Sequence, residues 1–371
     1  MVPTRLIERL DRAIGAADDP LQREYLKAER AGAIARLGLL PDARFALSGL
    51  RGRNARHKDT LLSAWISLLE GQIDHFDSIA PKAIDKFEKA RELAESAGNA
   101  PLQALASAWL ANCAFNAADV PALTRYATTA LKLAGPDQHT AQARASVVLA
   151  DAYLCCDDEA NSHAWYVRAR AHASAEGDSS MISVMLHNIS AMRSSQIALA
   201  DAFGRADLER ARKALLEAGS AANYDNGTGV ASLSAMVPVI RAQLLVALSR
   251  FEEAARLFDE HMERARQEGM AHRGARLLAD RAWCHVRLGH VAQALADANA
   301  AEVGARNQRD ADDRAAAYAR LARIHRHGGR DAAADALQAE ADKALAEYQA
   351  YQSNTRKALD EALVGFGQQP T

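Results

Sequence analysis

The strongest constraint on this chain is a spacing of about forty residues between small residues that hold the same place in a repeated segment. Three segments, 242–254, 282–294 and 322–334, align without gaps. Each begins with alanine, has serine or glycine seven residues later, and has a second alanine twelve residues after the first. Self-similarity at a fixed period is typical of repeat architectures. The first small residue recurs at Ala31, Gly71, Ala111, Ala150, Ala242, Ala282 and Ala322.

One interval in this series is longer than the others. The steps between the small residues are 40, 40, 39, 92, 40 and 40 residues. The step of 92 contains one longer and irregular unit, in which Ala211 supplies the second alanine. Each unit is expected to be a helix, a tight turn and a second antiparallel helix, because small residues let two helices lie close together. The count predicts eight helix pairs.

Helix-ending and helix-starting residues stand where this division requires them. Glycines predicted to break the chain between helices are Gly38, Gly98, Gly135, Gly177, Gly269, Gly289, Gly328 and Gly329. Residues predicted to cap helix N-termini are Asp59, Asn99, Asp137 and Asp178. No segment alternates with a period of two, so no sheet is expected. The predicted fold is all-α: a right-handed superhelical solenoid of about eight antiparallel helix pairs with a long C-terminal capping helix.

Leu149-Ala150-x-x-Tyr153, followed by a second helix, resembles the tetratricopeptide signature. The resemblance covers about residues 20–345. The chain departs from the commonest form, because its period is near forty rather than thirty-four and it lacks the repeat-ending proline. It is similar in this to long-period variants in bacterial transcription regulators, peptide-pheromone receptors and sensor regions of signalling enzymes. The resemblance implies that the first helix of each pair lines a concave groove.

Five segments are expected along the chain. They are an N-terminal capping helix at 1–19, four helix pairs at 20–177, an irregular longer repeat at 178–228, further repeats at 229–329, and a long helix and tail at 330–371. The stretch 223–229 is predicted to be a hinge loop. It contains two glycines but lacks the spacing and the lysine of a phosphate-binding loop.

The last helix is expected to run from about Asp331 to Leu363 without a break. Its apolar stripe comprises Ala341, Leu345, Tyr348, Thr355, Leu359 and Ala362. A helix of this length overhangs the repeats, so part of the stripe needs another surface. The helix could fold back as a cap, pair with a second copy in a homodimer, or lead into another domain.

The repeat frame selects residues expected to face the groove and bind a partner. They are Asn112, Asn116, Arg144, Arg193, Gln196, Gln243, Arg276, Trp283, Arg287, Arg323, Arg326 and His327. The two asparagines are four residues apart on one helical face and suit an extended peptide backbone, because each amide both donates and accepts. The arginines favour an acidic or carboxylate-bearing partner. Alternatively, the C-terminal set is solvated and paired with Asp280, Asp312 or Asp313; this set comprises Arg287, Arg323, Arg326 and His327.

Composition and motifs argue against other classes of protein. Lys plus Arg is 45 against 47 for Asp plus Glu, a formal charge of −2, which argues against a nucleic-acid partner. The four cysteines form no C-x-x-C pair, and the histidines lack metal-ligand spacing. No apolar run long enough for a membrane span or a signal peptide is present. We therefore expect a cytoplasmic chain with no catalytic residues, no metal and no cofactor.

Two functions fit these features. The first is a non-catalytic scaffold or regulator in bacterial-type signalling, which holds a protein or peptide partner in the groove. The alternative is a ligand- or peptide-responsive sensor module of a signalling or transcription-regulating system, whose output domain is absent from this chain.

Overall fold

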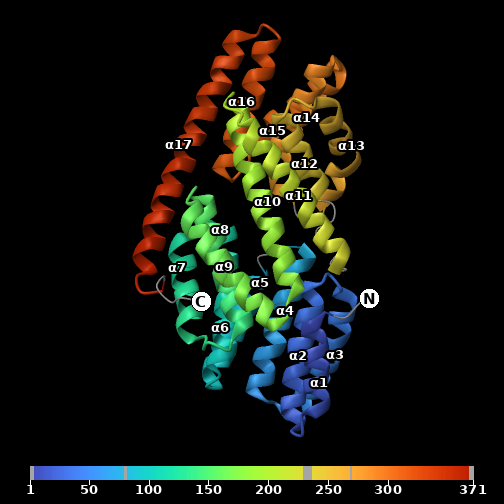
Figure 1. The fold of residues 1–371 in the computed structure, drawn as a ribbon, viewed down its shortest axis with the longest axis vertical. Coiled ribbons are helices and arrows are strands. Elements are labelled where there is room, and N and C mark those ends of the chain that lie inside the picture. The colour runs from blue at the N-terminus through green and yellow to red at the C-terminus, as the bar shows by residue number, and fades with distance from the viewer. Residues whose placement is uncertain (1–3, 79–81, 229–235, 268–269, 367–371) are drawn as a thin grey trace. The chain divides into compact units, whose positions relative to one another are not determined.

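The computed structural model describes residues 4–78, 82–228, 236–267 and 270–366. Within these ranges all regular structure is helical and no strand occurs (Figure 1). The elements are α1 (Arg5–Ala16), α2 (Pro20–Arg36), α3 (Leu40–His57), α4 (Thr60–Ser78), α5 (Lys82–Ser96), α6 (Ala100–Asn116), α7 (Val120–Leu133), α8 (His139–Cys155), α9 (Glu159–Glu176), α10 (Ser179–Ala202), α11 (Leu208–Thr228), α12 (Met236–Ala247), α13 (Phe251–Gln267), the 3-10 turn η1 (Met270–Arg273), α14 (Gly274–Leu288), α15 (Val291–Arg306), α16 (Ala311–His327) and α17 (Asp331–Ala362).

After α1, the helices form eight consecutive pairs, from α2–α3 to α16–α17. This confirms the predicted all-α solenoid of paired helices. The irregular unit is the pair α10–α11, and α10 is the long first helix that the spacing of 92 residues implies. The described part of the chain contains no helix that is both long and apolar enough to cross a membrane.

The small residue in each first helix permits close approach of its partner. A Cβ atom added to Gly71 of α4 would lie 2.6 Å from the Phe87 ring of α5, which is too close for any side chain. Ala150 and Ala282, at the same repeat position in α8 and α14, are fully buried. Close-packed interiors tolerate little added volume, so a larger residue here would force the helices of a pair apart.

Three of the four predicted N-caps are confirmed. Asp59, Asn99 and Asp178 each accept a hydrogen bond from a backbone N–H three residues later, at 2.6, 2.9 and 3.1 Å. The prediction for Asp137 is wrong, because α8 begins after Gln138 and has no side-chain cap. Of the predicted breakers, Gly269 lies outside the described residues.

The residues group in space into two compact units. Unit 1 comprises 1–185, 225–232 and 354–371, and unit 2 comprises 186–224 and 233–353. The helices α10, α11 and α17 therefore contribute residues to both units. The five predicted segments follow helix ends, whereas these two units group residues by spatial proximity.

The prediction of a hinge loop at the end of the irregular repeat is wrong. Helix α11 continues to Thr228, so residues 223–228 are helical, and Gly229 lies outside the described residues. Asp225 of α11 is buried and its carboxylate accepts a hydrogen bond from the Ser183 hydroxyl at 2.5 Å. A hydrogen-bonded side chain at this point favours the helix over the turn that the asparagines and glycines indicate in sequence.

In unit 1, α1 packs against α2 as the predicted capping helix. Leu6, Ile7 and Leu10 are buried in one cluster with Ala33 of α2 and Leu37, which directly follows α2. The backbone N–H of Leu6 also donates to the Gly177 carbonyl at 3.3 Å. A Cβ atom at Gly177 would lie 2.7 Å from the Arg5 Cβ, and the φ of Gly177 is +73°, so glycine is required here on both counts.

The apolar stripe of α17 is covered in part by this chain. Ala341 belongs to the core of unit 2, and Thr355 and Leu359 are fully buried in unit 1. The Tyr153 hydroxyl of α8 donates to the Asp360 carboxylate at 3.0 Å. Leu345, Tyr348 and Ala362 of the same stripe are half-buried, and the homodimer through this helix stays a prediction.

Candidate functional site

One face of each first helix can be defined by counting from its small residue as position 0. Positions −6, −2, +1 and +5 are three or four residues apart, so they lie on one side of an α-helix. In α14 these positions hold Arg276, Asp280, Trp283 and Arg287. We call this side of the first helices the inner face.

In unit 2 the inner face carries a cluster of aromatic and cationic side chains, the Trp283 surface, made of Phe251, Trp283, Arg287, Arg323 and His327. The Arg287 guanidinium carbon lies 4.8 Å from the Phe251 ring centroid and 5.5 Å from that of Trp283. The Arg323 guanidinium lies 4.8 Å from the Trp283 centroid, and the His327 ring meets the indole edge-on at 5.9 Å. The structure therefore brings together four of the predicted groove residues around one indole.

The Trp283 surface is positively charged and partly open to solvent. Arg287 and His327 are exposed, whereas Trp283 is buried beneath them. Arg287 has no carboxylate partner in the described ranges. Burial, with the positive charge of Arg320 and Arg287 nearby, lowers the pKa of Arg323, although Asp201 opposes this. A group that is attracted by these cations would also be shielded from water by the rings.

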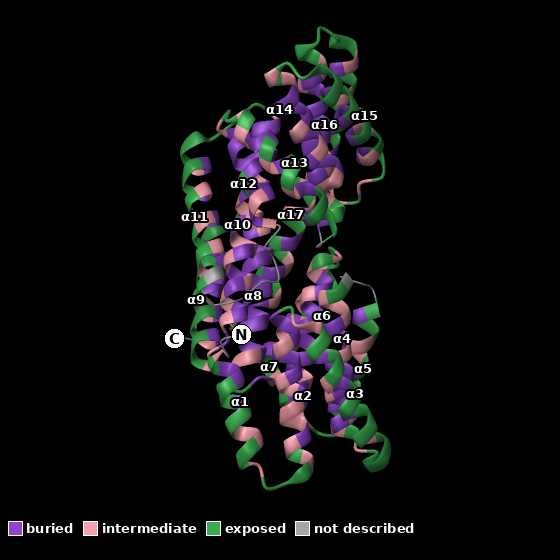
Figure 2. Cartoon of the chain, turned by 90° about the vertical axis from the view of Figure 1, so that its right-hand side faces the viewer, coloured by how far each residue is buried: buried purple, intermediate pink, exposed green. Residues whose placement is uncertain are grey.

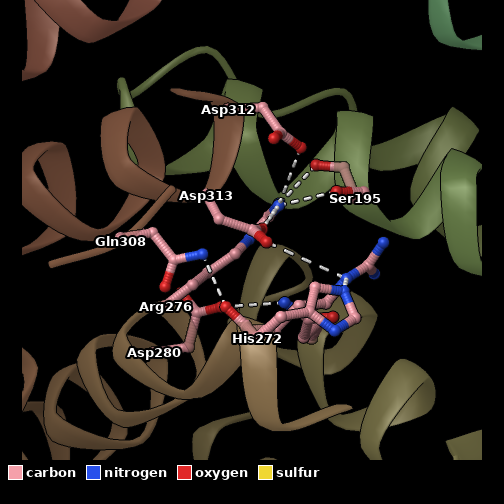
Figure 3. Close-up of polar contacts among 9 residues, drawn as sticks. Ser195, His272, Arg276, Asp280, Gln308, Asp312 and Asp313 are labelled. Atoms are coloured by element: carbon pink, nitrogen blue, oxygen red, sulfur yellow. Dashed lines mark hydrogen bonds and ion pairs between the residues drawn. The ribbon is translucent and has the colours of Figure 1, made fainter. Parts of the chain in front are cut away.

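Deeper on the same face, the structure places Arg276 inside the protein rather than in a groove. Its guanidinium donates to the Ser195 hydroxyl at 2.6 Å, to the Ser195 carbonyl, and to Asp313 at 2.8 Å (Figure 3). Burial alone would lower the pKa of Arg276, but Asp313, Asp312 and Asp280 outweigh burial and raise it. The prediction that Arg276 faces a partner is corrected, because the residue is 1% exposed and its guanidinium is bound by Ser195 and Asp313.

A second buried arginine, Arg320 of α16, completes this network. It contacts Asp280 at 2.9 Å and Asp201 of α10 at 2.6 Å. The Gln243 side-chain amide donates to Asp280 at 3.3 Å, so Gln243 is also buried and not a groove residue. The predicted alternative pairing is wrong in its partners. Asp280 and Asp313 are held by the buried Arg320 and Arg276, whereas Arg323 pairs with Asp201 and Arg326 with Asp335. The sequence analysis missed Arg320 and Asp201, although Arg320 stands at position −2, on the inner face.

In unit 1 the inner face is organised around Trp109 of α6. The Arg144 guanidinium of α8 lies 3.4 Å from the Trp109 ring centroid, and the Phe87 ring stacks on the same indole at 5.2 Å. The His75 ring meets Trp109 edge-on at 5.3 Å. Burial, and secondarily Arg144, lower the pKa of His75 to about 4, so this imidazole is neutral near pH 7. Arg144 is 6% exposed and therefore almost wholly inside.

The two asparagines lie on the same α6 face as Trp109, three and seven residues further along. Asn112 is half-buried and Asn116 is exposed. Neither side chain hydrogen-bonds to any part of the chain that the structure describes. Both amides are therefore available, and the partner binding that their spacing predicts stays a prediction.

The other predicted groove residues are engaged in pairs on the protein surface. Arg193 contacts Glu217 at 2.7 Å, and Gln196 accepts a hydrogen bond from Arg210 at 2.8 Å. Arg326 contacts Asp335 at 2.9 Å. Exposed pairs of this kind stabilise little and compete with a partner for the arginines.

The sequence predicts no catalytic or metal-binding groups. Among the described residues, one cluster has side chains that could hold a metal ion. His272, Asp310 and Asp313 place potential ligand atoms within 4.8 Å of one another. Asp313 is already paired with Arg276, and a metal ion would sit beside that guanidinium. Burial raises the pKa of the Cys284 thiol, so it keeps its proton and is no nucleophile.

Comparison with known proteins gives the fold. No protein-family description matches the chain, and no curated protein matches it by sequence. Among solved structures, the chain is similar to "Crystal Structure of Rap Protein Complexed with Competence and Sporulation Factor", with a TM-score of 0.52 and 13% identity, over 96% of this chain and 92% of that one. The fold of this chain is a tetratricopeptide-like helical repeat.

Proposed function

We propose that this chain is a non-catalytic regulator that binds a peptide or protein segment bearing carboxylate groups. The Trp283 surface carries this proposal. Arg287 and Arg323 present guanidinium groups beside one indole, and no carboxylate of the described chain pairs with Arg287. Guanidinium groups bind carboxylates in a bidentate geometry, and aromatic neighbours strengthen that bond by excluding water.

The fold supports the same class of function. A solved protein of this fold, the Rap protein, carries a bound factor. The forty-residue period resembles that of long-period regulatory repeats, and this resemblance supports the proposal that the chain acts in bacterial-type signalling. Helical repeats bind through extended surfaces that are largely formed before the partner arrives.

The mechanism would be contact at several points along a preformed surface. Trp283 and Phe251 supply apolar area for a side chain, and Arg287 and Arg323 fix an adjacent carboxylate. Arg287 would carry the largest share of the specificity, because it is exposed and pairs with no carboxylate among the described residues.

The test is binding to an array of short peptides of mixed sequence, with free or amidated C-termini. We expect the wild type to retain peptides rich in Asp, Glu or a free carboxylate, and Arg287→Glu to lose about tenfold or more in affinity for them. The matched control is Arg212→Glu, which reverses the charge of an exposed arginine of α11 in the same unit. Its binding should equal that of the wild type.

Equal retention by wild type and Arg287→Glu, with both folded by circular dichroism, would reject the Trp283 surface as the binding site. If no peptide is retained by any form, the regulator proposal gives way to the sensor alternative, for which small-molecule ligands are the next probes.

A further inference from the structure

Unit 1 contains a group of buried N–H donors that have no acceptor. They are Nε of Arg36 in α2, Nε1 of Trp109 in α6 and Nε of Arg144 in α8. All three residues are at least nine-tenths buried. Buried donors in native proteins are nearly always hydrogen-bonded, so three orphans in one unit call for a physical explanation.

Arg144 is the most unusual member of this group. Its guanidinium carbon lies 3.4 Å from the Trp109 ring centroid, and the side chain forms no hydrogen bond or ion pair with the described part of the chain. The nearest buried acid is already engaged: Asp178 binds Arg36 at 2.8 Å, the Ser180 hydroxyl at 2.5 Å and the Met181 N–H at 3.1 Å. Arg144 is therefore a buried cation whose charge no carboxylate balances.

The lowered pKa of Arg144 reflects the energetic cost of burying its charge without a bound anion. Burial, followed by repulsion from Arg36, lowers the pKa of Arg144 to about 9, and the attraction of Asp178 compensates only in part. A buried guanidinium is normally stabilised by a hydrogen-bonded anion, and contact with an indole face is a weaker substitute. Arg276, at the same repeat position in unit 2, has such an anion in Asp313.

We propose that Arg144 and Trp109 form a binding site for the carboxylate group of a ligand. The guanidinium would neutralise the carboxylate and donate to its oxygens, while the indole N–H, an atom of the ring that Arg144 contacts, supplies a further donor. Asp178, the buried acid that attracts Arg144, does not occupy the position, because it is held by Arg36.

The surroundings of the site suit a ligand longer than the carboxylate alone. His75 and Phe76 of α4 are half-buried beside Trp109, with ring centroids 5.3 and 5.8 Å from the indole. Asn112, half-buried and one turn beyond Trp109 on α6, has a free amide. A chain entering over these residues would meet apolar rings, then an amide that can bind its backbone, and end at Arg144.

The same chemistry could come from a free small acid, from the C-terminus of a peptide or from an acidic side chain. The site lies in unit 1 and does not depend on the Trp283 surface of unit 2, so the two proposals stand or fall separately.

The primary test is the melting temperature of the full chain in sodium chloride and in sodium acetate at equal ionic strength. The variants are Arg144→Met, which removes the guanidinium, and Arg170→Met, a control at an exposed arginine of α9 in the same unit. Acetate at about ten times its Kd should raise the melting temperature of the wild type and of Arg170→Met by roughly 2 °C. Arg144→Met should show no rise.

Three peptides then identify the source of the carboxylate: Ala-Ala-Ala as the free acid, the same peptide acetylated and amidated, and acetyl-Ala-Asp-Ala-amide. The readout is the indole N–H resonance of Trp109, assigned by its loss in Trp109→Phe. Movement with the free acid alone points to a peptide C-terminus, movement with the aspartyl peptide points to a side chain, and movement with acetate alone points to a small acid.

Two results would overturn the site. One is an acetate effect of equal size in the wild type and Arg144→Met. The other is an unmoved Trp109 resonance with acetate and all three peptides, which would mean that water alone occupies the donors. Neither result would affect the Trp283 surface, because Arg287→Glu leaves unit 1 unchanged.

Discussion

Arg144 and Arg276 stand at the same repeat position, six residues before the small residue of a first helix, yet their surroundings differ. Arg276 is enclosed by Ser195 and Asp313, which are 81 and 37 residues away in sequence. Arg144 meets an indole and no acid. The repeat frame thus determines where an arginine points, while the residues that arrive from elsewhere decide whether its charge is already balanced.

The difference separates two uses of one inner face. In unit 2, Asp201, Asp280 and Asp313 balance the buried arginines. On the Trp283 surface Arg323 still pairs with Asp201, and Arg287 is the exposed cation that pairs with no carboxylate of the described residues. In unit 1 the unbalanced cation is in the interior. A charge that the chain itself satisfies contributes to the fold, whereas an unsatisfied one is available to a ligand.

The largest expected effect is from removing Arg276. Arg276→Met should lower the free energy of unfolding by about 3–5 kcal/mol, because Asp313 and the Ser195 carbonyl are left buried without their partner. Urea denaturation followed by circular dichroism measures this. A loss below about 1 kcal/mol would mean that the network is solvated and that the two arginines do not differ as described.

A partner introduced for Arg144 should convert unit 1 toward the arrangement of unit 2. Cys113 lies close enough to Arg144 for the guanidinium to counteract the burial that raises the thiol pKa. Cys113→Asp should interact with Arg144 by about 1–3 kcal/mol in a double-mutant cycle with Arg144→Met. It should also abolish the acetate effect. Zero coupling in urea denaturation would show that the two side chains do not meet.

The ionisation of His75 reports on the charge of Arg144. Its pKa is about 4 in the folded protein, against about 6.5 when unfolded, so the unfolded chain binds a proton first as the pH falls. The stability that neutral His75 provides is complete above pH 6.5 and is lost as the pH falls toward 4. His75→Gln should reduce that loss by about 1–2 kcal/mol, measured by denaturation at pH 7 and pH 4.5.

In Arg144→Met the same pH dependence should become shallower, because one of the two causes of the low His75 pKa is removed. Burial, the larger cause, remains. An unchanged pH profile in this variant would indicate that Arg144 does not act on His75.

The smallest effect is expected for Arg144→Met itself at pH 7 without ligand. Removing an unbalanced buried charge recovers desolvation energy but gives up the contact with the Trp109 ring. The free energy of unfolding should therefore stay the same or rise by about 1 kcal/mol, measured under the conditions used for Arg276→Met. A fall of 3 kcal/mol or more would reveal an internal partner and remove the contrast between the two arginines.

Local patterns determined most of the fold in advance. The forty-residue spacing gave all eight helix pairs, the long α10 and the long α17, because small residues, caps and breakers act through neighbours in sequence. The loop predicted at 223–229 failed, since the carboxylate of Asp225 meets Ser183, which is 42 residues away. Local turn propensity takes no account of a contact between residues so far apart in sequence.

The candidate site divides in the same way. The sequence by itself determined which residues share the inner face, and so it selected Trp283, Arg287, Arg323, His327 and Arg144 together. Figure 2 shows what it could not determine, which is how deeply each helix is buried: α8 and α12 are largely buried, whereas the second helix α11 is more exposed. The burial of a side chain depends on which helix packs against it. Arg276 and Arg320 contact residues of α10 that lie more than 80 positions away in sequence. Helical periodicity fixes a direction within one helix, but the balance of a buried charge is fixed only when distant helices meet.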